Sequence, residues 1–102
     1  MSEHFRYEMG YTEHEFAQVL KGRFSGPASV YRCEEIGRLN WILRHVNDPI
    51  EVKVRIEQAE PRQLGNLKLP VLKVAFSLEQ HSEASRTAFF DKFFKYFHKG
   101  GG

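Results

Sequence analysis

A wide aromatic face on one predicted helix constrains this chain more than any other feature of its sequence. Ser82 is placed to cap a helix that continues to His98, with Glu83 in its first turn. At 100° per residue, the aromatic side chains of this segment fall within an arc of about 160°. They are Phe89, Phe90, Phe93, Phe94, Tyr96 and Phe97. Such a face must pack against another layer, and in a short chain only the apolar side of a sheet has that size.

The preceding sequence supplies strands for that sheet. Apolar and charged residues alternate strictly from Ile50 to Glu57, which predicts a strand with one buried and one charged face. Phe5–Tyr11 alternates in the same way and predicts a first strand. A hairpin is predicted within Val30–Val46, with its turn at Glu34–Gly37, although Leu39–Val46 also fits a helix.

A short helix is predicted between the first strand and this hairpin. Thr12 and Glu15 have the spacing of a capping box, in which both side chains satisfy unpaired N–H groups of the first helical turn. Gly22 and the Ser25-Gly26-Pro27 cluster are expected to end the helix.

The segment before the last helix contains a change of phase. Ala59–Asn66 includes a proline and a glycine and predicts a loop. Leu67 and Leu69 then begin an apolar alternation, which Pro70 interrupts and which continues one residue out of phase from Leu72 to Leu78. Because a shift of one residue turns side chains to the opposite face, we predict one strand with a bulge or kink near Pro70.

Together these elements predict a two-layer α+β fold. An antiparallel sheet of about five strands is expected in the order β-α-β-β-β-β-α, with the long C-terminal helix packed on one face. The order resembles that of the TATA-binding-protein-like and helix-grip folds, a topological resemblance that implies no function. We predict a single domain over residues 1–102, with residues 99–102 as a flexible tail. A terminal Gly-Gly is also found in ubiquitin-like modifiers, but glycine after a helix is an ordinary cap.

Composition excludes several classes of protein. The 102 residues are 41% hydrophobic and 27% charged, which is the profile of a folded domain rather than a disordered chain. The net charge of +2 is spread along the sequence and does not favour a nucleic-acid partner. No apolar stretch is long enough to cross a membrane, so no membrane association is expected. The single Cys33 and the lack of a secretory signal favour a cytoplasmic location.

No group of residues has the spacing of a catalytic or metal site. The five histidines show no ligand pattern, and Cys33 lacks the turn or glycine-rich loop that would activate a nucleophile. Glu34 and Glu35 are adjacent, and adjacent residues on a strand point to opposite faces. We therefore predict no catalytic residue, no metal and no cofactor.

The leading functional hypothesis is a non-enzymatic binding or accessory domain. A gap between sheet and C-terminal helix would hold a small apolar or acidic ligand, or the domain would bind a protein partner. The candidate ligand-binding residues are Arg6, Arg44, Arg55, Arg62, Tyr31, Trp41, Phe90 and Phe94. Alternatives are a small enzyme using the same pocket, a homo-oligomeric interaction module and a weak nucleic-acid binder, so the protein is expected as a monomer or homodimer.

Overall fold

The computed structural model describes residues 2–98 and contains five strands and two helices. In chain order these are β1 (Glu3–Met9), α1 (Glu13–Arg23), β2 (Tyr31–Gly37), β3 (Asn40–His45), β4 (Glu51–Leu64), β5 (Leu67–Glu79) and α2 (Glu83–Tyr96). The predicted α+β class and element order are confirmed. The predicted flexible tail, residues 99–102, lies outside the described residues.

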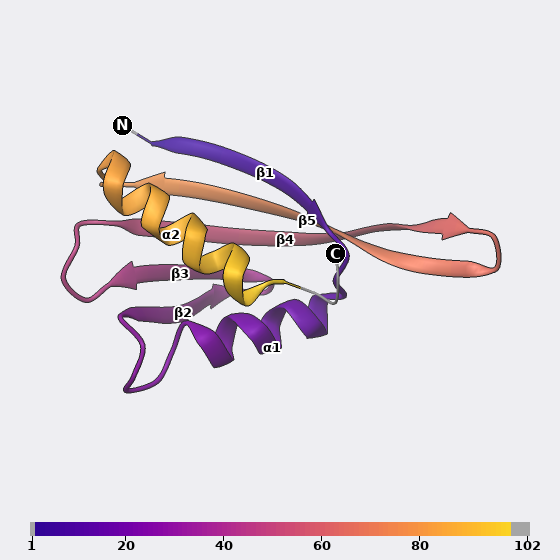
Figure 1. The fold of residues 1–102 in the computed structure, drawn as a ribbon, viewed down its shortest axis with the longest axis horizontal. Coiled ribbons are helices and arrows are strands. Elements are labelled where there is room, and N and C mark those ends of the chain that lie inside the picture. The colour runs from indigo at the N-terminus through magenta and orange to yellow at the C-terminus, as the bar shows by residue number, and fades with distance from the viewer. Residues whose placement is uncertain (1, 99–102) are drawn as a thin grey trace.

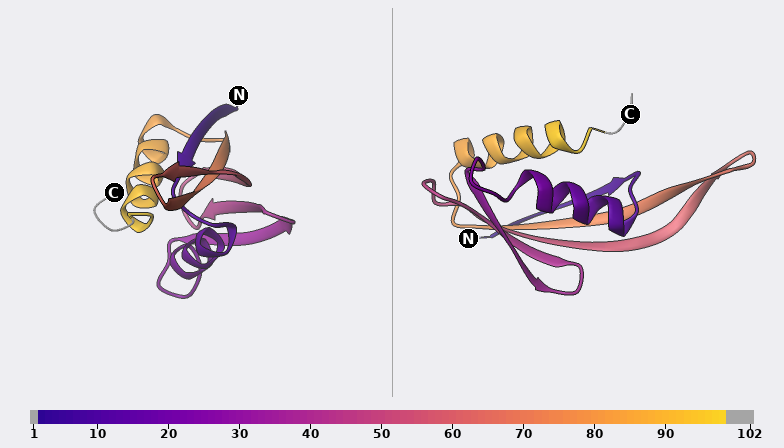
Figure 2. Two further views of the ribbon diagram at one scale, coloured as in Figure 1. Left: turned by 90° about the vertical axis from the view of Figure 1, so that its right-hand side faces the viewer. Right: turned by 90° about the horizontal axis from the view of Figure 1, so that it is seen from below.

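All five strands form one antiparallel sheet in the order β1-β5-β4-β3-β2. Strands β2 to β5 are therefore joined as consecutive hairpins, and β5 lies beside β1, which forms one edge of the sheet (Figure 1). Both helices lie on the same side of the sheet (Figure 2), so the opposite side carries no helix. We call that side the open face.

Side-chain caps fix the start of both helices. The N–H of Glu15 donates to the Thr12 hydroxyl at 3.1 Å, and the Thr12 N–H donates to the Glu15 carboxylate at 2.9 Å, which confirms the predicted capping box. Ser82 caps α2 in the same way through Ser85. The second helix ends at Tyr96, slightly before the predicted limit of His98.

The predicted turn at Glu34–Gly37 is wrong. These residues belong to β2, and the chain reverses at Arg38 and Leu39 instead. Leu39 adopts a φ of 62°, a left-handed conformation that leucine rarely takes, and the Asn40 amide donates to the Arg38 carbonyl. Because the turn lacks the usual glycine at this position, the sequence pattern did not mark it.

The predicted loop at Ala59–Asn66 is also wrong. The fourth strand continues to Leu64, and only Gly65 and Asn66 form the turn, with Gly65 at a φ of 58°. Beyond the end of β1, this hairpin projects from the sheet as a two-stranded ribbon (Figure 1). We call residues 60–71 the arm.

The predicted irregularity lies on the neighbouring strand. The last strand runs without interruption, and the register shifts in β4 between Ala59 and Arg62, opposite Pro70. Proline has no N–H to donate, so a break in the ladder at this point is expected. Since β5 itself keeps its alternation, Leu72 and Leu78 face the helices whereas Leu67 and Leu69 lie on the other side.

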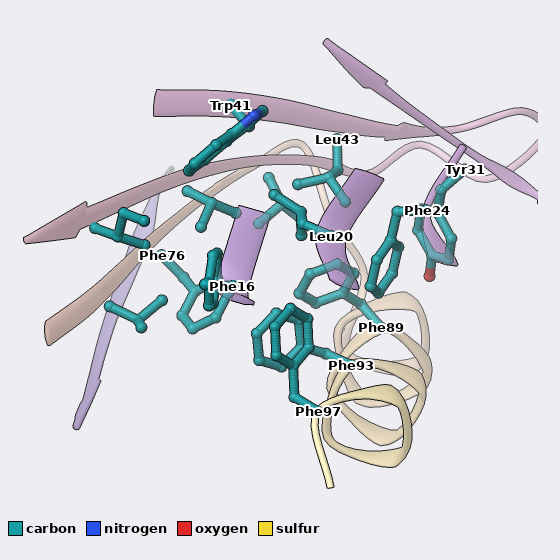
Figure 3. Packing of buried hydrophobic residues seen from close by; sticks show 14 of the residues in the cluster. Phe16, Leu20, Phe24, Tyr31, Trp41, Leu43, Phe76, Phe89, Phe93 and Phe97 are labelled. Carbon is teal, nitrogen blue, oxygen red and sulfur yellow. The ribbon is translucent and has the colours of Figure 1, made fainter. Parts of the chain in front are cut away.

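Aromatic rings fill the space between sheet and helices (Figure 3). Phe93 of α2 is fully buried, and its ring centroid lies 4.9 Å from that of Phe76 on β5 and 6.2 Å from that of Phe16 on α1. Phe24 extends this packing to Tyr31 at 5.4 Å. Rings at these distances are in contact. The phenylalanine side chains of α2 therefore pack against the sheet as predicted.

A hydrogen-bonded cluster joins β1 to the start of α2. The carboxylate of Glu3 lies 2.6 Å from His81 Nε2 and 2.6 Å from Arg86 Nη1. The bond from His81, and then that from Arg86, holds the pKa of Glu3 below its ordinary value of 4.5. A lowered pKa in the folded state stabilises the protein above the unfolded pKa, and this contribution is lost as the pH falls below it.

We therefore expect Glu3→Gln to lower the melting temperature at about pH 7, where the wild-type carboxylate is ionised. The difference from wild type should shrink once the pH falls below 4.5. Thermal melts followed by circular dichroism over this pH range test the point. A difference that stays constant down to the lowest pH would show that the charge of Glu3 contributes nothing.

Candidate functional site

The open face carries a group of basic side chains around two small residues. In the sheet register, Ala75 of β5 lies between Arg6 of β1 and Arg55 of β4. One step further along the same strands, Ser77 lies between His4 and Lys53. We call this set the basic trough, and it consists of His4, Arg6, Lys53, Arg55, Ala75 and Ser77.

The small side chains leave room between the basic ones. A depression of about 340 Å³ is lined by Arg6, Arg55 and Ala75 and, at its other end, by Glu8, Glu57 and Lys73. A second depression of about 330 Å³ shares Arg6, Arg55 and Ala75 and adds Lys53 and Ser77. Because the flanking strands are two strand spacings apart, the backbones of Arg6 and Arg55 are separated by about 10 Å. That spacing lets both guanidinium groups reach one anionic group between them.

The basic residues of the trough differ in their ion pairing from Arg44 and Arg62. Arg44 lies within 3.7 Å of Glu34 and 3.5 Å of Glu51, and Arg62 lies 3.8 Å from Glu8. Within residues 2–98, by contrast, no carboxylate lies within 4.0 Å of the basic groups of Arg6, Lys53 or Arg55. The trough therefore presents cationic groups that are available to an external anion.

The structure separates the eight predicted ligand-binding residues. Arg6 and Arg55 meet in the trough, whereas Arg44 and Arg62 are held by carboxylates. Tyr31 and Trp41 are buried in the core, and burial raises the pKa of Tyr31 to about 12. Their rings pack against helix residues.

The two remaining candidates lie on α2. Phe90 is half-buried against Phe5 of β1, at a centroid distance of 5.1 Å. Phe94 is 39% exposed and packs beside Tyr7 at 5.1 Å. Rings thus occupy the space where a ligand between sheet and helix was expected, and the depressions described above lie on the other side of the sheet.

Four residues of the trough did not appear among the predicted site residues: His4, Lys53, Ala75 and Ser77. A signal for the last two was present, because small residues interrupt the large residues of β5 at alternate positions. The alternation also placed Lys53 on the same face as Arg55. Which residues lie opposite one another across strands was not visible from the sequence.

The single cysteine, Cys33, lies on β2, which β3 separates from the strands of the trough. Burial raises the pKa of the Cys33 thiol, and a hydrogen bond with Ser25 only partly offsets this. A thiol with a raised pKa is mostly protonated at neutral pH and is a poor nucleophile. Within residues 2–98, His, Cys, Asp and Glu side chains form no group of three or more that would hold a metal ion. Over the same residues, no helix has the length and hydrophobicity needed to cross a membrane.

Comparison of the chain with protein-family models, with curated proteins and with solved structures found no match.

Proposed function

We propose that this protein is a non-enzymatic binding domain that holds an acidic ligand on the open face of its sheet. The observation that carries the proposal is the basic trough, in which no basic group of Arg6, Lys53 or Arg55 has a carboxylate of residues 2–98 within 4.0 Å. Of the two depressions that these residues flank, the one beside Lys53 and Ser77 has no carboxylate in its lining, whereas Glu8 and Glu57 line the far end of the other. Guanidinium groups bind carboxylates and phosphates through paired hydrogen bonds, and these are stronger than bonds between neutral groups.

The distribution of aromatic rings argues against a single-stranded nucleic acid as the ligand. Sheets that bind single strands stack the bases on exposed rings. Here the rings of the strands pack on the helix side, as Tyr7 does against Phe94, Trp41 against Phe16 and Phe76 against Phe93. The trough offers charge without a stacking surface, which suits compact anionic groups better than bases.

The proposal predicts that the double variant Arg6→Gln, Arg55→Gln binds acidic probes at least about tenfold more weakly than wild type, since each charged hydrogen bond contributes roughly 1.5–3 kcal/mol. Isothermal titration calorimetry with inorganic pyrophosphate and with a glutamate hexapeptide measures the two affinities. Both substitutions lie on an exposed surface, so the fold should be retained.

The matched control removes two positive charges elsewhere, through Arg38→Gln in the β2–β3 turn and Lys95→Gln on α2, which are both exposed. This variant should bind like wild type. Equal weakening by both double variants would show that only net charge matters. If the wild-type protein binds neither of the two probes, the proposal is contradicted.

A further inference from the structure

The arm presents a stripe of exposed leucines. Leu64 is 57% exposed, Leu67 is 65% exposed and Leu69 is 41% exposed. The first two are paired across the turn, and Leu69 is paired with Arg62 two positions further along. Paired residues, and residues two positions apart on one strand, share a face. We call Leu64, Leu67 and Leu69 the leucine stripe.

The leucine stripe continues the open face of the sheet. Arg62, which shares its face of the arm, forms an ion pair with Glu8 of β1. Glu8 lies on the open face, one row beyond the basic trough, beside Lys73 and Glu57. Going along β5, the surface therefore passes from the trough to a mixed-charge row and then to the stripe.

The edges of the arm are poorly suited to pairing with another strand. Pro61 and Pro70 each lack an N–H, and the register of β4 shifts between Ala59 and Arg62. Prolines and bulges at sheet edges are devices that prevent strand addition. Because these features disfavour strand addition, a partner of the arm is expected to contact its leucine-bearing face.

The charge of the surface and the apolar area that it can bury distinguish between the possible binding partners of the arm. Three partly exposed leucines offer far less than the roughly 800 Å² per partner that a stable dimer buries. A second copy would also bring an identical excess of basic groups. A continuous lipid surface with anionic headgroups would bring negative charge against the carboxylates of Glu8 and Glu57, which lie between stripe and trough, whereas a peptide can pass over them with neutral residues. In nucleic acid the apolar surface is mainly that of the base faces, which stack on aromatic rings, and the leucine stripe has none.

We propose that the open face and the arm together bind an acidic polypeptide segment of another protein, a step that rests on the proposed function. Its carboxylates occupy the basic trough, and its apolar side chains cover the leucine stripe. Ala75 and Leu69 are six residues apart on β5, a distance of about 20 Å. An extended segment of about six residues spans this distance, so acidic and apolar residues should be separated by that length.

Synthetic peptides test the proposal. Each peptide carries glutamates at one end and leucines at the other, and both chain orders are made. A serine spacer joins the two ends, and it is either about six or about two residues long. A matched peptide has serines in place of the leucines. We expect wild type to bind the long-spacer leucine peptide, in one chain order, at least about tenfold more tightly than the serine peptide, because burial of one leucine contributes that much.

The arm variant Leu64→Ser, Leu67→Ser should lose this difference while binding the serine peptide and pyrophosphate like wild type. Val46→Ser, at another exposed apolar residue, is the control and should behave as wild type. Fluorescence anisotropy measures the affinities. The inference would be overturned if the serine peptide binds through Arg6 and Arg55 and neither the leucines of the peptide nor those of the arm change the affinity. The proposed function would then still stand.

Two other results would also overturn the inference. One is a wild-type dimer in sedimentation experiments that the arm variant converts to a monomer, which would make a second copy the occupant. The other is binding to phosphatidylcholine and phosphatidylserine vesicles that the arm variant loses. If wild type binds neither acidic peptide nor pyrophosphate, the proposed function itself fails.

Discussion

Replacing Phe93 with alanine is expected to lower the free energy of unfolding by about 3–5 kcal/mol. The Phe93 ring is completely buried where α2 faces the sheet, and it contacts rings of both helices and of β5. Its removal leaves a cavity that the surrounding phenylalanines cannot fill without leaving their own contacts. A domain of this size has a total stability of roughly 5–15 kcal/mol, so the variant should be partly or largely unfolded at 37 °C.

The neighbouring residue on the same helix provides the control. Phe94→Ala removes an equal number of atoms, but Phe94 is 39% exposed and lies at the edge of the aromatic cluster. Its loss should cost less, about 1–2 kcal/mol, because the ring is only partly removed from water and has fewer contacts to lose. Urea denaturation followed by circular dichroism compares the two variants. Equal destabilisation would contradict the packing of α2 described above.

The second large effect is expected for Val54→Asp. Val54 is 1% exposed on the central strand β4 and lies between Trp41 and Phe76 in the sheet register. Among residues 2–98, the buried layer around this position contains no cation, and a single neutral N–H, such as that of the buried Trp41 indole on the neighbouring strand, would not compensate the charge of a carboxylate. Burial of an unpaired charge should therefore lower the free energy of unfolding by more than about 4 kcal/mol and prevent folding.

Arg55→Asp introduces the same side chain one residue later, on the open face. It should cost only about 1 kcal/mol, because aspartate is a poor strand residue but remains hydrated there. Solubility, circular dichroism and the urea midpoint distinguish the two variants. If Val54→Asp folds as stably as Arg55→Asp, the assignment of the two faces of β4 is wrong.

The sequence predicted those parts of the fold that have one buried face. The strict alternation from Ile50 to Glu57 and the phenylalanine spacing in α2 both arise because one side of the element contacts the core. The arm was missed for the opposite reason. Residues 60–71 extend beyond the helices, so no burial imposes a pattern, and Pro61 and Gly65 then resemble loop residues.

The candidate site depended on information that one strand does not carry. The alternation placed Arg6 and Arg55 on polar faces of two strands far apart in sequence. Their position on either side of Ala75 depends on how β1 and β4 each pair with β5. Pairing over such sequence separation is set by the whole sheet, so the basic trough emerged only with the register.

The most direct test of the account is to map where an acidic ligand binds. Amide chemical shifts of the isotope-labelled protein, titrated with the glutamate hexapeptide, report the contacted strands. We predict that the largest changes occur at Arg6, Lys53, Arg55, Ala75 and Ser77, with no comparable change at Phe90 or Phe94 of α2. Changes confined to α2 and the inner side of the sheet would contradict the account and place the ligand between sheet and helix.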